Sequence, residues 1–236
     1  GMPFTFLAGD KGTGEGSRRL YKRLGKDLAD VEFEGLVLHY LMPDVTGHGH
    51  IMETISQAAR QPFLIADAGA MYVAKMAGLA DRYDLFTPDI GELAFLADEV
   101  APHPFYTRGF ILHEEHRVPH LVERAYLHKN ASRFLMVKGQ IDYLADRTGI
   151  IGTVDRPLTA AMEAIGGTGD TLTGIVSALI SAGFATTDAC LKAFHVNRLA
   201  GALASPDPST QVARIIECIP EALQELGIGV KVRISQ

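Results

Sequence analysis

The chain has 236 residues, and its 22 basic and 28 acidic side chains give a formal charge of −6. A composition of 47 % hydrophobic and 21 % charged residues excludes a disordered chain and is typical of a globular domain. No basic run interleaved with aromatics points to nucleic acid, and no apolar run is long enough for a membrane span. Two distant cysteines, Cys190 and Cys218, fit a reducing compartment, so we expect a cytoplasmic protein.

Strands and helices alternate along the first part of the chain. The apolar periodicity predicts strands at 3–8, 35–41, 62–66, 84–86 and 133–137, and helices at 17–28, 49–60, 70–77, 92–99 and 119–128. Residues 101–118 show no clean period and are expected to be irregular. The alternation favours parallel strands joined by helical crossovers.

The second part of the chain begins with a predicted hairpin at 141–145 and 149–154. A glycine cluster at 166–170 then leads into a core helix that ends at Gly183, and two further helices are expected at 188–204 and 211–226. Pro220 is expected to interrupt the last of these. Together the elements predict one α/β domain with a mainly parallel sheet and an antiparallel edge hairpin.

Ligands of open parallel sheets bind at the carboxyl ends of the strands. Among the residues that follow a predicted strand or open a helix, the cluster Gly166-Gly-Thr-Gly-Asp170 is the strongest candidate. Its glycines allow close approach of a ligand, and the helix behind it points free N–H groups and the positive end of its dipole at the same place. A phosphoryl group is the expected ligand, with Asp170 as proton acceptor. The alternative is an ordinary helix start whose first-turn carboxylate complements the dipole.

Other candidates carry weaker signals. The segment Gly9–Ser17 lacks the Gly-Lys-Ser/Thr ending of a nucleotide loop, so it is either a phosphate site or a flexible turn. Lys138 could contact a phosphate or a carboxylate, or be an exposed structural lysine. Asp67 and Asp89 could bind Mg²⁺ or a hydroxylated substrate, or cap helices. His48-Gly-His50 and His113-Glu-Glu-His116 resemble fragments of metal sites, but neither completes a zinc signature.

Several motifs resemble those of the ribokinase-like superfamily, in particular Gly167-Thr-Gly-Asp170 followed by Thr171-Leu-Thr-Gly174, together with Val137-Lys-Gly139 and Thr87-Pro-Asp-Ile-Gly-Glu92. Within it, the chain most closely resembles the ADP/ATP-dependent NAD(P)H-hydrate dehydratases, from about Leu64 to the C-terminus and including Ala66-Asp-Ala-Gly-Ala70. The resemblance implies a ribokinase-like three-layer sandwich with helices on both faces of the sheet. It also implies ATP or ADP and Mg²⁺ as cofactors.

The resemblance assigns roles to residues in three groups. The nucleotide phosphates are expected at Gly166, Gly167, Thr168 and Gly169, near Lys138 and Gly139. Asp170 is the implied catalytic base, and His39, Asp67, Asp89 and Glu92 are expected on the substrate side. The implied reaction phosphorylates the hydroxyl of hydrated NADH or NADPH and then eliminates phosphate.

The chain departs from the dehydratases at three places. Asp89-Ile90 stands where they have His-Pro, Gly69 replaces a second Asp, and His39-Tyr-Leu-Met-Pro-Asp44 stands in place of a Gly-Pro-Gly element. The chain also looks shortened on its N-terminal side. Two alternatives therefore remain open: a small-molecule kinase of the same superfamily that acts on a sugar or vitamin precursor, and a catalytically silent nucleotide-binding protein. A homo-oligomer is also left open.

Overall fold

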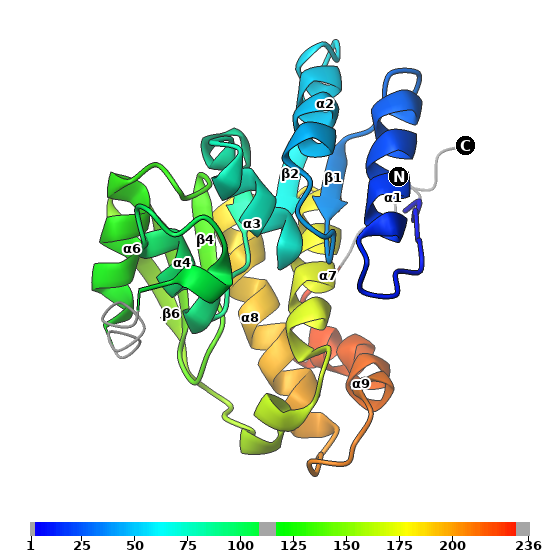
Figure 1. Cartoon of the computed structure of the whole chain (residues 1–236). Coiled ribbons are helices and arrows are strands. Elements are labelled where there is room, and N and C mark those ends of the chain that lie inside the picture. The colour runs from blue at the N-terminus through cyan, green and yellow to red at the C-terminus, as the bar shows by residue number, and fades with distance from the viewer. Residues whose placement is uncertain (1–2, 109–116, 230–236) are drawn as a thin grey trace. The chain divides into compact units, whose positions relative to one another are not determined.

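The computed structural model describes residues 3–108 and 117–229 (Figure 1). Its internal contacts divide the chain into two compact units, Gly1–Val137 with Ala145–Ile150, and Lys138–Leu144 with Ile151–Gln236. The single domain that we predict over residues 1–236 stays a prediction. His113 and His116 lie outside the described residues.

The central sheet has six strands in sequence order. These are β1 (Gly35–Leu38), β2 (Phe63–Ala66), β3 (Leu85–Phe86), β4 (Phe134–Val137), β5 (Asp142–Asp146) and β6 (Gly149–Val154). The first four pair in parallel, with Ile65 opposite Leu85 and Leu85 opposite Phe134. The predicted mainly parallel sheet with an antiparallel hairpin at its edge is confirmed.

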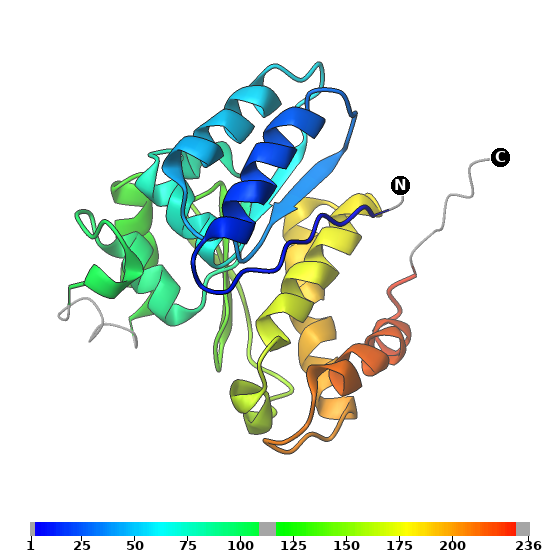
Figure 2. The same cartoon turned by 45° about the vertical axis from the view of Figure 1, so that its right-hand side comes forward.

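The first unit carries α1 (Glu15–Asp27), which precedes β1, and the helices that connect the parallel strands. The connecting helices are α2 (Val45–Ser56), α3 (Gly69–Met76), α4 (Ile90–Ala97) and α6 (Val118–Leu127). Because the crossovers advance in one direction through neighbouring strands and are expected to be right-handed, α2, α3, α4 and α6 belong to one face of the sheet. Figure 2 shows α1 and α2 running side by side. The core of this unit includes all of β3 and β4 and the buried stretch Leu93–Ala97.

The second unit is built mainly from three helices, α7 (Thr168–Ser181), α8 (Thr186–Leu203) and α9 (Val212–Glu225). The helix α8 packs against both α7 and α9 (Figure 1). Cys190 on α8 and Cys218 on α9 are buried and form no disulfide. No helix in the described part of the chain is long and apolar enough to cross a membrane.

One predicted strand, one predicted helix start and one predicted helix interruption were wrong. Residues 3–8 form no strand, because their backbone pairs with no sheet neighbour and Phe4 and Leu7 are 81 % and 89 % exposed. The second helix begins at Val45 rather than residue 49, because Asp44 caps it by accepting the N–H of Gly47 at 3.0 Å. The helix α9 continues through Pro220, where the buried side chains of Ile215, Cys218 and Ala222 hold both of its halves.

Candidate active site

The glycine cluster of the second unit forms the start of α7, as predicted. Gly167 is the N-cap in the left-handed conformation with φ of 98°, and as a glycine it supplies no side-chain hydrogen bond to the helix. Thr168 ties the preceding loop down by donating its hydroxyl to the carbonyl oxygens of Met162 and Ile165, both at 3.3 Å. Since the first N–H groups of an α-helix lack partners within the helix, the loop presents donors and a positive dipole end to a ligand.

Lys138 lies against this helix start. It follows β4 directly, and its Nζ is 3.2 Å from the position that a Cβ on Gly169 would take. A larger residue at 169 would therefore push the lysine away. The structure brings together, within the second unit, the predicted Lys138, the glycine loop and Asp170 in the first turn of α7. This combination of an ammonium group and a helix N-terminus is suited to a phosphate.

Two side chains of α8 brace this region, and we did not predict either. Asn197 donates to the carbonyl oxygen of Thr168 at 3.1 Å and accepts the hydroxyl of Thr171 at 2.6 Å, so it fixes the first turn of α7. Arg198 forms a buried ion pair with Asp142, with 2.6 Å between Nε and Oδ2. A signal was present in the sequence, since the arginine interrupts the apolar face formed by Phe194, Ala200 and their neighbours.

The Arg198–Asp142 pair also shapes the turn after Lys138. Arg198 donates through Nη2 to the carbonyl oxygens of Gly139 at 2.9 Å and Gln140 at 3.0 Å. Asp142 accepts the N–H of Gly139 at 3.1 Å. Through these bonds α8 holds the backbone on the carboxyl side of Lys138, which defines where the lysine side chain starts.

In the first unit, the predicted residues His39 and Asp67 lie together at the carboxyl ends of β1 and β2. Nε2 of His39 is 3.2 Å from Oδ2 of Asp67, which is only 2 % exposed and also accepts the N–H of Ala68 at 2.9 Å. The residues that follow this pair along the chain, Tyr40 and Ala68, both have positive φ, at 50° and 49°. Strained backbone of this kind in non-glycine residues is concentrated at functional sites.

Gly69, after β2, lies against the segment at residues 39–44 that follows β1. A Cβ added to Gly69 would lie 2.1 Å from the carbonyl oxygen of Leu41, which belongs to the segment that replaces the Gly-Pro-Gly element. No side chain fits at position 69 while residue 41 keeps this position. The glycine at position 69 and the course of this segment therefore depend on each other.

Asp89 and Glu92 form a capping box at the start of α4. Asp89 accepts the N–H of Glu92 at 2.7 Å, and Glu92 accepts the N–H of Asp89 at 2.9 Å. Glu92 also accepts the hydroxyl of Tyr72 at 2.7 Å, and burial together with this carboxylate raises the pKa of Tyr72 above its usual range. The structure thus shows the helix-capping alternative for Asp89, and a substrate role for either residue stays a prediction.

In the glycine segment at 9–17, the carboxylate of Asp10 occupies the backbone N–H groups that a phosphate would need. Asp10 accepts the N–H groups of Thr13, Gly14 and Ser17 at 3.0–3.1 Å, and these bonds, that of Ser17 foremost, hold the pKa of Asp10 below its usual value. Of the two alternatives left open for this segment, the structure favours the turn. His48 and His50 do not lie together on the protein surface, because His48 is fully buried and His50 is exposed.

Comparison with known proteins identifies a family model and two similar sequences. Residues 45–221 match the carbohydrate-kinase family model described as NAD(P)H-hydrate dehydratase. An uncharacterized protein of Methanocaldococcus jannaschii is 43 % identical over 217 residues, which are 92 % of this chain and 89 % of that protein. The bifunctional NAD(P)H-hydrate repair enzyme Nnr of Hyperthermus butylicus is 41 % identical over 91 residues, which are 38 % of this chain and 16 % of the enzyme.

Solved structures confirm the fold. A protein of Bacteroides thetaiotaomicron named for phosphomethylpyrimidine kinase superposes with a TM-score of 0.54 at 18 % identity, over 91 % of this chain and 75 % of that one. Pyridoxal kinase from Entamoeba histolytica superposes with a TM-score of 0.53 at 18 % identity, over 86 % and 74 %. The fold is that of ribokinase-like kinases, and with a family match over most of its length the chain belongs to the carbohydrate-kinase family described as NAD(P)H-hydrate dehydratase.

Proposed function

We propose that this protein is a nucleotide-dependent NAD(P)H-hydrate dehydratase, which phosphorylates the hydroxyl of hydrated NADH or NADPH and eliminates phosphate. The observation that carries the proposal is the start of α7, where a helix N-terminus with a glycine N-cap, Lys138 and Asp170 occur together. Membership of the family over residues 45–221 supports it.

The nucleotide phosphates would lie against the backbone N–H groups of Thr168 and Gly169, with the Lys138 ammonium beside them. Gly167 and Gly169 suit this role because they have no side chain to block the approach of a phosphate. Mg²⁺ prefers few protein carboxylates together with substrate phosphates, so it would enter with the nucleotide and neutralise part of the charge. Asp170 is a donor of the right kind for such a hard cation.

The proposed chemistry needs one proton acceptor and fixed positive charge. Asp170 takes the hydroxyl proton while the substrate oxygen attacks the terminal phosphorus. The bond to the leaving group breaks, which is ADP when the donor is ATP and AMP when the donor is ADP. In the second step the C–O bond of the phosphate ester breaks and inorganic phosphate leaves. A proton on the neighbouring ring carbon passes to water, and its C–H electron pair restores the carbon–carbon double bond of the reduced nicotinamide. Lys138 and the helix N-terminus stabilise the charge on the moving phosphoryl group.

A second candidate is a kinase that leaves a stable phosphate ester on a small hydroxylated molecule. It is favoured by the sequence departures at Gly69 and at residues 39–44 from the dehydratase pattern, which lie against each other at the ends of β1 and β2. The structural relatives named as phosphomethylpyrimidine and pyridoxal kinases are consistent with it at the level of the fold. Both candidates use the same groups of the second unit, so they differ only in the acceptor and in the fate of its phosphate.

One assay separates the candidates. Purified protein is given hydrated NADH with ATP or ADP and Mg²⁺, and both the near-ultraviolet absorbance of the reduced nicotinamide and free phosphate are followed. Recovery of absorbance with one phosphate released per ring restored supports the dehydratase. Turnover of nucleotide with a stable phosphorylated product supports the kinase, and nucleotide binding without turnover over a panel of hydroxylated metabolites supports a silent protein.

The role of Asp170 has its own test. Asp170→Asn is expected to lower turnover about a thousandfold while nucleotide affinity stays within a few fold, because the amide cannot take a proton. Asp188→Asn is the matched control, since Asp188 also lies in the first turn of a helix of the second unit but pairs on the surface with Lys192 at 2.8 Å. Equal turnover of wild type and Asp170→Asn would remove Asp170 from the mechanism.

A further inference from the structure

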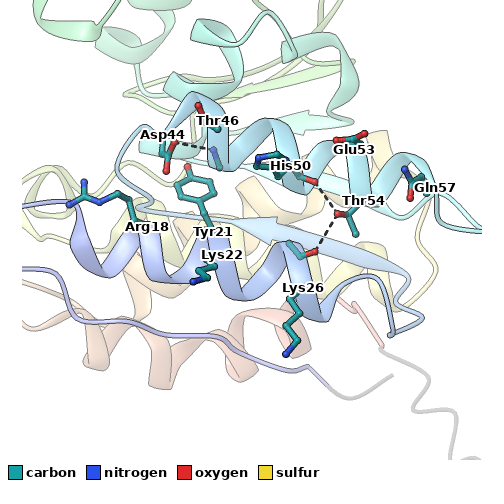
Figure 3. A pocket seen from close by; sticks show the side chains of 12 residues that line it. Arg18, Tyr21, Lys22, Lys26, Asp44, Thr46, His50, Glu53, Thr54 and Gln57 are labelled. Atoms are coloured by element: carbon teal, nitrogen blue, oxygen red, sulfur yellow. Dashed lines mark hydrogen bonds between the residues drawn. The ribbon is translucent and has the colours of Figure 1, made fainter.

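Two regions of the first unit gather polar side chains, and they differ in whether those side chains converge. A groove of about 620 Å³ between α1 and α2 is lined by charged residues. Figure 3 shows Lys22 and Lys26 directed away from α2, so the walls of this groove do not converge on a ligand. At the carboxyl ends of β2 and β3, by contrast, several polar groups meet at the hydroxyl of Tyr72 on α3.

The carboxylate of Glu92 is held through both of its oxygens. Its Oε1 accepts the hydroxyl of Tyr72 at 2.7 Å, and its Oε2 accepts the N–H of Asp89 at 2.9 Å. The second bond belongs to the capping box of α4. The first joins α3 to α4, across 20 positions of the chain, and is no part of the cap. Two bonds to different oxygens fix the orientation of the carboxylate as well as its position.

The ring of Tyr72 is itself fixed by aromatic neighbours. It packs edge-to-face on Phe95, with ring centroids 5.6 Å apart and planes at 83°, and its centroid is 6.5 Å from that of His103. Phe95 is fully buried and lies one helical turn beyond Glu92 on α4. Because the ring is anchored in the core on one side, the direction in which its hydroxyl points is set by packing.

The same hydroxyl lies within the electrostatic range of three carboxylates. Burial raises the pKa of Tyr72 above its usual range, and Glu92, Asp89 and Asp67 raise it further. The phenol therefore stays protonated near neutral pH and donates its hydrogen bond to Glu92, which favours the ionised carboxylate. Asp67 follows β2, and Asp89 follows β3, so Glu92 is held at the edge of the sheet where ligands of open parallel sheets bind.

We propose that Tyr72 is a positioning residue of the acceptor site. It holds the ionised carboxylate of Glu92 in place, and Glu92, which is partly exposed, accepts a hydrogen bond from a hydroxyl of the acceptor substrate. This assignment rests on the function proposed above, because it requires a hydroxylated acceptor. A carboxylate that is already oriented loses less side-chain freedom when it binds a hydroxyl, so it binds more tightly than a mobile one.

Tyr72→Phe tests the proposal because it removes the hydroxyl and keeps the ring. We expect the KM of the hydroxylated acceptor to rise about tenfold, while kcat and the KM of the nucleotide change less than about twofold. The matched control is Tyr126→Phe. Tyr126 donates its hydroxyl to the backbone carbonyl oxygens of Arg133 at 3.2 Å and Ala145 at 3.3 Å, so its loss should leave both KM values unchanged.

A double-mutant cycle separates positioning from a general effect on stability. Glu92→Gln keeps an oxygen for the N–H of Asp89 and removes the charge. If Tyr72 acts through Glu92, adding Tyr72→Phe to Glu92→Gln should change the KM of the acceptor by less than about twofold. Effects that multiply in the double variant would overturn the proposal. So would a lowered melting temperature of Tyr72→Phe with an unchanged KM, because Tyr72 would then serve as a structural bridge between α3 and α4.

A measurement without turnover keeps this proposal separate from the proposed function. The amide of Asp89 reports the place of the Glu92 carboxylate, because Oε2 accepts its proton. We expect hydrogen exchange at Asp89 to be about threefold faster or more in Tyr72→Phe, and unchanged in Tyr126→Phe. Unchanged exchange in Tyr72→Phe would contradict the positioning of Glu92. If the wild type turns over no hydroxylated acceptor, the proposed function fails, and exchange at Asp89 still decides whether Tyr72 positions Glu92.

Discussion

Two glycine-rich segments lead into helices of this protein, and they differ in what occupies the helix start. At α1, the Asp10 carboxylate accepts the N–H groups of Thr13, Gly14 and Ser17, so the donors are already used. At α7, the N-cap Gly167 supplies no side-chain hydrogen bond to the helix, the segment holds no carboxylate ahead of the helix like Asp10, and Lys138 lies beside Gly169. The glycines give both segments the left-handed turn they need, at Gly14 and Gly167.

The difference shows that glycine content alone does not make an anion site. The first segment places an acidic residue five positions before the helix, where it can fold back onto the N–H groups. The second places its acid inside the helix, at the third position, and takes its shape from residues distant in sequence. A closed loop of the first kind contributes to stability, whereas an open one of the second kind can bind a ligand.

The largest effect is expected when the ion pair between Arg198 and Asp142, which holds the turn after Lys138, is removed. Arg198→Met leaves Asp142 as an uncompensated buried charge and is expected to lower the free energy of unfolding by about 4 kcal/mol, measured by urea denaturation. Lys192→Met breaks an exposed pair on the same helix and is expected to cost less than about 1 kcal/mol. A loss in Arg198→Met as small as that of the control would contradict the bracing role of α8.

A second prediction concerns the first unit, whose stability we expect to fall at acid pH. His48 on α2 is fully buried against Tyr83, neither ring nitrogen has a hydrogen-bond partner among the described residues, and desolvation lowers the pKa of His48 to about 4. The unfolded chain takes up this proton near 6.5, so stability falls as the pH is lowered from 6.5 to 4, by about 3 kcal/mol in total.

His48→Leu is expected to flatten the dependence of unfolding free energy on pH in that window. His50→Leu, two residues away on the exposed side, should leave the dependence as it is in the wild type. Hydrogen exchange at pH 4 to 5 should show α2 losing protection before α7. A profile unchanged in His48→Leu would mean that another group controls the acid sensitivity.

A smaller effect is expected at Gly169. Its substitution by alanine brings a methyl group to 3.2 Å from Nζ of Lys138, and the flexible end of the lysine can move away at little cost in stability. Nucleotide affinity should therefore fall by about tenfold while the melting temperature is nearly unchanged. Gly174→Ala, in the same helix with no atom within 4 Å of the added methyl, should keep its affinity. Equal affinities in the two variants would separate Lys138 from the phosphate.

The smallest effect on ligand binding is expected at Asp10. Asp10→Ala removes the acceptor of three N–H groups, so the melting temperature should fall, and nucleotide affinity should not change. Asp10→Asn keeps an acceptor and should recover part of the stability. A loss of nucleotide affinity in Asp10→Ala would mean that the first segment also takes part in nucleotide binding.

Local patterns predicted the sheet, most helices and the glycine loop of α7, because apolar periodicity and glycine spacing act over a few residues. They could not predict that Arg198 pairs with Asp142, 56 positions earlier in the chain, since only the packed second unit brings them together. The apolar run at 3–8 was misread as a strand because pairing with a neighbour, and not composition, makes a strand. The exposed Phe4 and Leu7 have no such neighbour in the sheet.

The most direct test of the nucleotide site is to follow backbone amide shifts while ADP or ATP is added with Mg²⁺. We predict saturable shifts at Thr168, Gly169 and Asp170, with the amides of Thr13, Gly14 and Ser17 unmoved because Asp10 holds them. Shifts at the first segment with none at the second would contradict the assignment of the phosphate site to α7.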